Sequence, residues 1–143
     1  MGQMSKIWGY ILEAPGRPKK AAQIEALTAL GADPTEFGTI WHDKVAKGST
    51  RPRGQLEDRE ALLNAVMSGD TVVFAAVLCI GVGVKDVEWF LGELAQRGVS
   101  VIVNGDLTRI GPGGDTAALQ KRFASAQNVN NKTRSIRGET KSK

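Results

Sequence analysis

The sequence TVVFAAVLCI, residues 71–80, is the strongest apolar run in the chain and decides how the rest is interpreted. The polar Ser68-Gly69-Asp70 precedes it, and Gly81-Val82-Gly83 follows it. An uninterrupted apolar run of this length, bounded by turn residues, is typical of a strand that is buried on both faces. We therefore expect residues 71–80 to form the central strand of a parallel sheet.

On either side of this run, short apolar segments alternate with segments of helical periodicity. Further strands are predicted at 7–12, 37–41 and 99–103, and helices at 19–30, 56–67 and 85–97. Strands that alternate with helices form βα units with right-handed crossovers. The pattern predicts an α/β fold with a mostly parallel central sheet of about four or five strands flanked by helices.

The predicted domain organisation has three parts. Residues 1–115 form the α/β domain, with loops at 42–55 and at the glycine-rich 106–115. A short helix follows at 116–127, where Leu119 and Phe123 are apolar. Residues 128–143 are dominated by Asn, Lys, Thr, Ser and Arg, a composition that predicts a disordered basic tail.

Composition excludes several classes of protein. The 143 residues are 41% hydrophobic, which suffices for one core. The chain has no run of about twenty apolar residues that would suit a membrane span, and no apolar segment of a signal peptide near its start. One cysteine and one histidine cannot build a disulfide framework or a zinc site. We expect no cofactor, no metal and a cytoplasmic protein, or a virion-associated one if it is encoded by a phage.

The net charge of +4 is distributed unevenly along the chain. Residues 121–143 carry seven Lys or Arg against one Glu, a net charge of +6, whereas residues 1–120 carry 12 against 14, a net charge of −2. Basic tails often contact nucleic acid because each phosphate contact releases condensed counterions. A solubilising tail with no such role is the alternative.

Two stretches carry a resemblance to a known family. The first strand reads Tyr10-x-Leu12-x-Ala14, and Gln23 follows nine residues after Ala14. The second stretch, after the strand that begins at Thr71, reads Leu78-Cys79-Ile80-Gly81-Val82, and Lys85 and Asp86 follow in register. In layout the chain resembles the catalytic domain of the serine recombinases, the resolvase/invertase family, whose signatures are Tyr-x-Arg-x-Ser with a Gln nine residues later and Asp-Arg-Leu-x-Arg.

The resemblance implies a resolvase-like three-layer fold, with Ala14 and Val82 facing one another near the ends of their strands. It also implies an inactive homologue of a DNA recombinase, from a recombination, mobile-element or phage system. The family's catalytic positions are occupied here by residues that lack the nucleophile, carboxylate and guanidinium groups: Leu12, Ala14, Leu78, Cys79 and Val82. Arg51, followed by Pro52, is the one catalytic-type Arg that is retained.

By the same resemblance, two basic loops border a DNA-facing cleft, and the basic tail adds further cations. The candidate DNA-contacting residues are Arg17, Lys19, Lys20, Lys44, Lys47, Arg51, Arg53, Lys121, Arg122, Lys132, Arg134 and Arg137. Contacts of this kind are expected to bind DNA without sequence preference. A solvated basic surface is the alternative. A protein partner or a homo-oligomer is also expected.

Two alternatives to the DNA-associated module stay open. One is a structural or assembly subunit that reuses the fold without DNA. The other is an unrelated small α/β enzyme or nucleotide binder, for which Gly81-Val82-Gly83 could be part of a phosphate-binding turn. Asp86, however, occupies the place of the third glycine of the dinucleotide fingerprint. Cys79 could also be read as a thiol nucleophile with His42 as its base. The apolar run around Cys79 favours the other interpretation, in which Cys79 is a small hydrophobic residue of the core.

Overall fold

The computed structural model describes residues 6–36, 38–45, 56–105, 109–111 and 115–141. Its centre is one five-stranded sheet in the order β2-β1-β3-β4-β5. The strands are β1(Ile7–Glu13), β2(Ile40–Lys44), β3(Thr71–Phe74), β4(Ser100–Val103) and β5(Arg109–Ile110). The first four are parallel, and β5 pairs antiparallel with β4 at one edge. The expected α/β fold with a mostly parallel sheet is confirmed.

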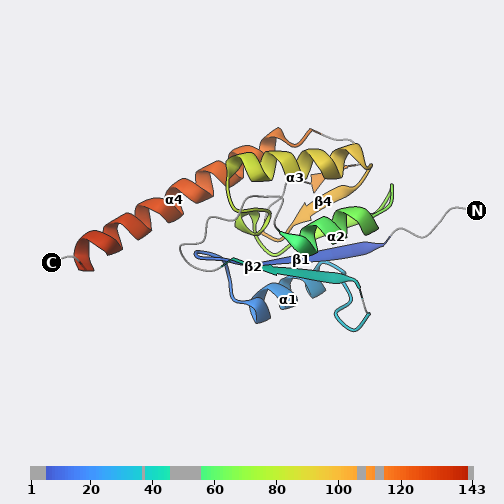
Figure 1. The fold of residues 1–143 in the computed structure, drawn as a ribbon, viewed down its shortest axis with the longest axis horizontal. Coiled ribbons are helices and arrows are strands. Elements are labelled where there is room, and N and C mark those ends of the chain that lie inside the picture. The colour runs from blue at the N-terminus through green and yellow to red at the C-terminus, as the bar shows by residue number, and fades with distance from the viewer. Residues whose placement is uncertain (1–5, 37, 46–55, 106–108, 112–114, 142–143) are drawn as a thin grey trace, which may run out of the picture.

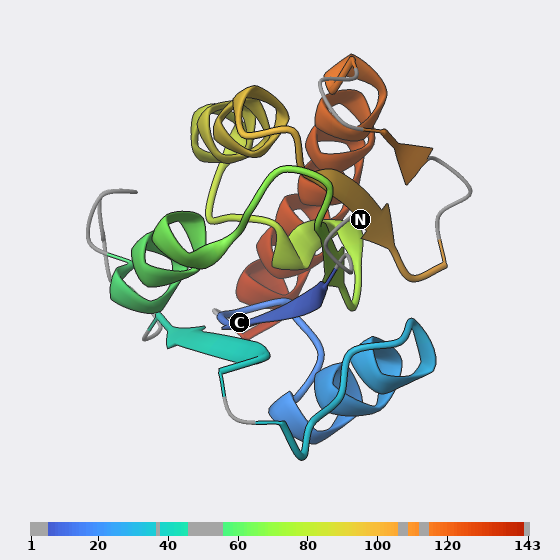
Figure 2. The same ribbon diagram turned by 90° about the vertical axis from the view of Figure 1, so that its right-hand side faces the viewer.

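Helices cover both faces of the sheet, so the molecule has three layers (Figures 1 and 2). One face carries α1(Lys20–Ala29), and the other carries α2(Glu57–Ala65), α3(Val84–Gln96) and the first half of α4(Ala117–Lys141). A short 3-10 helix, η2(Val77–Cys79), contacts both β1 and α4. This arrangement is consistent with the three-layer resolvase-like fold that was expected.

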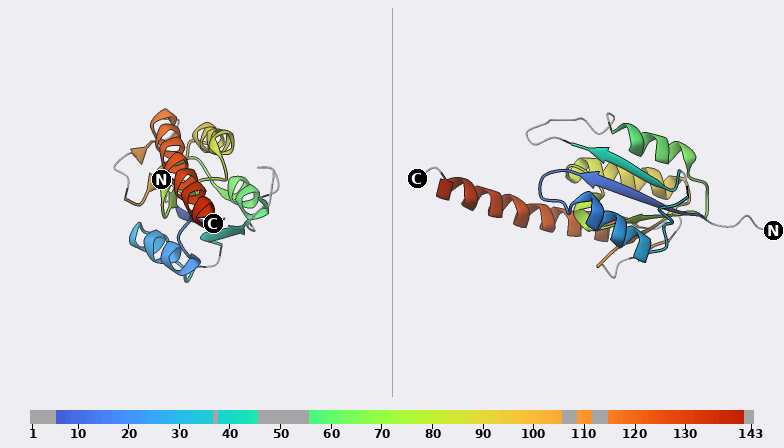
Figure 3. Two further views of the ribbon diagram at one scale, coloured as in Figure 1. Left: turned by 90° about the vertical axis from the view of Figure 1, so that its left-hand side faces the viewer. Right: turned by 90° about the horizontal axis from the view of Figure 1, so that it is seen from below.

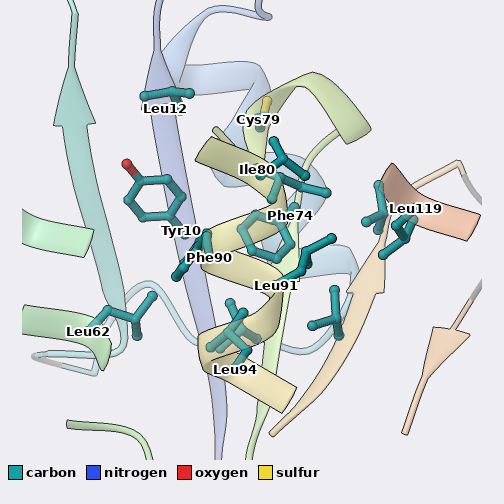
Figure 4. Packing of buried hydrophobic residues seen from close by; sticks show 14 of the residues in the cluster. Tyr10, Leu12, Leu62, Phe74, Cys79, Ile80, Phe90, Leu91, Leu94 and Leu119 are labelled. Atoms are coloured by element: carbon teal, nitrogen blue, oxygen red, sulfur yellow. The ribbon is translucent and has the colours of Figure 1, made fainter. Parts of the chain in front are cut away.

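Alternating side chains of β1 supply both cores. Ile11 packs with Leu27 and Val73 beneath α1, whereas Tyr10 and Leu12 point into the larger core under α2, α3 and α4. In that larger core the rings of Tyr10, Phe74 and Phe90 meet edge to face, with centroids 5.9 to 6.2 Å apart (Figure 4). The sheet is therefore buried on both faces, as its apolar strands require.

The apolar run 71–80 is not one strand, which corrects the sequence-based prediction. Its strand ends at Phe74, which pairs with Tyr10 and Val103, and the chain then turns through η2. Cys79 and Ile80 stay fully buried in the larger core. An apolar run signals burial, but it does not distinguish a strand from a buried helical turn, and here the helical turn replaces the second half of the strand.

Three other boundaries differ from the prediction. The second strand lies at Ile40–Lys44 rather than 37–41, so it takes in the polar pair His42 and Asp43, and Phe37 lies outside the described residues. The glycine-rich segment 106–115 contributes the short β5. The C-terminal helix does not end near 127 but continues to Lys141, through part of the segment predicted to be disordered. In the described ranges no helix is both long and apolar enough to cross a membrane.

Candidate functional site

The five positions that would carry the recombinase chemistry gather at the carboxyl edge of the sheet, against the larger core. Leu12 and Cys79 are fully buried in that core, and Ala14, Leu78 and Val82 pack against it. Ala14 and Val82 thus lie on the same side of the sheet, as expected. The side chains at these five positions contain neither a hydroxyl, a carboxylate nor a cation, and all five belong to the larger core or pack against it.

Arg17 joins the loop after β1 to the segment after β3. Its Nε donates a hydrogen bond to the carbonyl of Leu78 at 2.8 Å, and Nη2 donates to the carbonyl of Gly81 at 2.7 Å. Nη1 donates to the carbonyl of Pro15 at 2.8 Å. The guanidinium therefore provides hydrogen-bond donors for backbone carbonyl groups in and just after η2, which are not paired with a neighbouring strand. This candidate DNA contact holds the fold together, and sequence reasoning did not assign it that role.

Gln23, at the family's Gln position, clamps the backbone of Leu12 from α1. Leu12 N–H donates to Gln23 Oε1 at 3.1 Å, and Gln23 Nε2 donates to the carbonyls of Leu12 and Pro18, each at 2.8 Å. Because Glu13 bonds to β2, Leu12 presents its backbone to the other edge of β1, beyond the last paired residue of β3. The buried amide thus replaces a missing strand partner and fixes the path of the chain toward Ala14.

A surface hollow of about 400 Å³ opens beside Ala14, where β1 and β2 end. Three of the candidate cations, Arg17, Lys19 and Lys44, lie in its wall, together with one acid, Glu13. The complete lining is Glu13, Ala14, Pro15, Arg17, Pro18, Lys19, Lys44 and Val45, and we call it the basic hollow. The carboxyl edge of a parallel sheet is where α/β folds place their binding sites.

Glu13 also lies against His42 at the rim of this site, and the pair is ionic only when the imidazole is protonated. Its Oε1 lies 2.6 Å from Nε2 of His42, and both side chains are about a quarter exposed, at 27% and 28%. The pair joins β1 to β2 on the face that α1 covers. His42 therefore lies on the opposite face of the sheet from Cys79, so the two do not form a thiol–imidazole pair. Burial raises the pKa of the Cys79 thiol to about 11, which is the behaviour of a core residue rather than a nucleophile.

A second hollow, of about 460 Å³, lies between η2 and α4 and is lined by Val77, Lys121, Arg122 and Ser125. Lys121 and Arg122 are exposed on α4, while Phe123 beside them is fully buried in the core. The first cations of the basic segment 121–143 therefore belong to the folded domain. Beyond it, α4 runs past the carboxyl ends of β1 and β2 (Figure 3).

The remaining candidate DNA contacts fall into three groups. Lys20 is exposed at the first turn of α1. Lys132, Arg134 and Arg137 belong to the part of α4 where only the backbone is described. Lys47, Arg51 and Arg53 lie outside the described residues, and so does the loop predicted to carry them.

A buried polar network under the carboxyl edge was not predicted from the sequence. Asp43 accepts hydrogen bonds from the Tyr10 hydroxyl at 2.8 Å and from the backbone N–H groups of Asp58 and Arg59 at 3.1 and 2.9 Å. It caps the N-terminus of α2 from a neighbouring strand. Burial, and then the Asp43 carboxylate, raise the pKa of Tyr10 far above its usual range, so the phenol stays a donor. In the sequence, the signal for this network was the hydroxyl of Tyr10, which lies within the otherwise apolar run 7–12.

Asp86 ties the turn Gly81-Val82-Gly83 to the first turn of α3. Its Oδ2 accepts the N–H of Val82 at 2.9 Å, and a Cβ on Gly81 would collide with that carboxylate. A carboxylate this close to the turn disfavours a bound phosphate, because the two charges repel. Among the residues that the structure describes, no three His, Cys, Asp or Glu side chains gather to hold a metal ion.

Comparison with known proteins adds no relative to these observations. The chain matches no family in a scan against protein-family models, and a search of curated proteins gives no match.

Proposed function

We propose that this protein is a catalytically inactive, resolvase-like domain that associates with DNA without sequence preference, as a module of a recombination, mobile-element or phage system. The observation that carries the proposal is the grouping of cations at one edge of the sheet. Arg17, Lys19 and Lys44 surround the basic hollow, and Lys121 and Arg122 line the hollow beside η2. The basic helix α4 leaves the domain on this same side (Figure 3).

The apolar cluster at the family's catalytic positions supports the absence of strand cleavage. Phosphodiester cleavage by this family needs a serine hydroxyl as nucleophile and guanidinium groups to stabilise the charge on the phosphoryl oxygens. Ala14 provides no attacking oxygen, and Leu12 and Cys79 are packed in the core where the resemblance places two arginines. Losing the nucleophile, the carboxylate and several cations together removes groups that act as a unit.

The charge distribution supports DNA as the partner. Residues 121–143 carry a net charge of +6, and in the structure residues 121–141 continue α4 instead of folding back onto the acidic remainder of the chain. Because α4 is long, carries net positive charge and extends from the cation-bearing edge of the sheet, it can lie along the evenly spaced phosphates of a duplex. No described element offers a base-reading motif, so the expected contacts are with the backbone.

A salt titration of DNA binding tests the proposal. The full chain is titrated against a labelled duplex at several salt concentrations, beside a variant in which Lys132, Arg134 and Arg137 are all changed to Gln. About four phosphate contacts would give a slope of log affinity against log salt near −3.6, and each contact that is lost flattens it by roughly 0.9. The triple variant should therefore show a clearly flatter slope on any duplex sequence.

Two controls define the outcome. Lys6→Gln removes one cation at the opposite edge of the sheet, where Lys6 pairs with Glu36, and should leave the slope unchanged. Lys19→Gln with Lys44→Gln removes the two lysines that line the basic hollow and should reduce affinity. If the full chain does not bind duplex DNA even at low salt, the nucleic-acid proposal fails, and an assembly or protein-interaction role replaces it.

A further inference from the structure

The wall of the basic hollow contains one group of the wrong sign for a phosphate. Glu13 lies among Arg17, Lys19 and Lys44, and its carboxylate is paired with the imidazole of His42 at 2.6 Å. A proton on His42 would place a further positive charge directly beside this carboxylate. The net charge facing a ligand in the basic hollow therefore depends on whether that one imidazole is protonated.

We propose that the Glu13–His42 pair makes phosphate binding in the basic hollow proton-dependent: protonated His42 neutralises Glu13 and strengthens DNA association, and loss of the proton weakens it. This inference rests on the proposed function and adds its regulation. Histidine is the side chain that most often changes its charge near neutral pH, and His42 is the one histidine of the sequence.

The surroundings of the pair favour a single titrating group. Lys44, two residues along β2, and Lys19, directly before α1, line the same hollow as Glu13. From α2, the carboxylate of Asp58 accepts the backbone N–H of His42 at 3.2 Å. The chain has one histidine and one cysteine, and the Cys79 thiol, with its pKa near 11, does not ionise in this range. A proton-linked change near neutral pH can therefore be traced to one side chain.

The test measures binding of the full chain to a short labelled duplex at constant ionic strength and two pH values. The parent chain should bind about three- to tenfold more tightly at about pH 6 than at about pH 8. His42→Gln should remove this difference. Glu13→Gln should bind at about pH 8 as tightly as the parent does at about pH 6, because the opposing charge is gone. Glu36→Gln, which removes an exposed carboxylate at the opposite edge of the sheet, should keep the parent's pH response.

A second readout follows from linkage. If protonation favours DNA binding, DNA binding must favour protonation by the same factor. The imidazole signals of His42, the only histidine, should therefore titrate at a higher pH with saturating duplex than without it. Equal affinity at both pH values, or a pH response that survives in His42→Gln, overturns this inference and leaves the proposed function intact. Absence of duplex binding at every pH overturns both.

Discussion

Arg59 and Asp86 form a buried ion pair in which Nη1 donates to Oδ2 at 2.7 Å and Nη2 donates to Oδ1 at 2.6 Å. Arg59 is fully buried and Asp86 is 6% exposed. The guanidinium also lies over the rings of Phe90 and Trp89, 4.8 and 5.3 Å from their centroids. The pair ties α2 to the first turn of α3, and through Asp86 it holds Val82, one of the positions at the carboxyl edge.

The first prediction follows from this pair. Arg59→Met leaves the Asp86 carboxylate buried without its main cation and should lower the free energy of unfolding by about 3–5 kcal/mol in urea denaturation. The double variant Arg59→Met with Asp86→Leu removes both charges and should recover much of that loss. Lys85→Met, an exposed neighbour on α3, is the matched control and should change stability by less than about 0.5 kcal/mol. A double variant no more stable than the single one would contradict the prediction.

The second prediction compares two glycines near α3. Gly81→Ala places a Cβ against the Asp86 carboxylate and 3.0 Å from Val87 Cγ2, so it should destabilise the protein by about 1–3 kcal/mol. Gly92→Ala lies within α3, where a Cβ meets nothing within 4 Å, and should stabilise by about 0.5–1 kcal/mol. Thermal unfolding of the two variants measures the difference. Equal effects would mean that Asp86 does not fold back over Gly81.

The third prediction concerns acid stability. Burial acts to raise the pKa of Asp70, but hydrogen bonds from Lys6 N–H, the Trp8 indole and Met67 N–H hold it below the usual value. A carboxylate whose pKa is lowered by folding contributes stability that is complete above its unfolded pKa, near 4, and is lost as the pH falls toward its folded pKa. Asp70→Asn should therefore destabilise at neutral pH and flatten the acid limb of a stability-against-pH curve. Glu88→Gln, at an exposed position on α3, is the control.

The fourth prediction concerns catalysis. The parent chain should neither nick supercoiled plasmid nor form a covalent adduct with DNA. Ala14→Ser should also fail, because Leu12, Cys79 and Val82 carry no guanidinium group that could stabilise the charge on the phosphoryl oxygens. Gel analysis of the plasmid and mass spectrometry of protein–DNA peptides measure both steps. A serine-linked DNA peptide from the Ala14→Ser variant would show that other residues complete the site.

The fifth prediction separates the folded part of α4 from its basic extension. Phe123 is fully buried in the larger core, so Phe123→Ala should cost about 3–5 kcal/mol. Val129 is 65% exposed two turns further on, and Val129→Ala should change stability by less than about 0.5 kcal/mol. Chemical denaturation measures both. A chain cut after residue 120 would lose Phe123, so charge substitutions are the cleaner test of the tail.

Periodicity alone predicted the layers of this protein. Runs such as 99–103 and the helix stripe at Val87, Phe90, Leu91 and Leu94 are visible because burial repeats every two or 3.6 residues. The same reasoning failed for 71–80, where local composition is as apolar in η2 as in β3. It also ended the C-terminal helix too early, because a polar composition predicts disorder whether or not a helix extends from a packed first turn.

What the amino-acid sequence determined by itself was the α/β alternation and the lack of a hydroxyl at position 14. What only the tertiary structure decided was which polar groups meet: Arg17 with Gly81, Asp43 with Tyr10, and Arg59 with Asp86. The partners in these pairs lie 64, 33 and 27 residues apart. A sequence pattern reports whether a residue is buried, since burial follows a short repeat. The hydrogen-bond partner of a buried polar group comes from another element, and the packing of the elements chooses it.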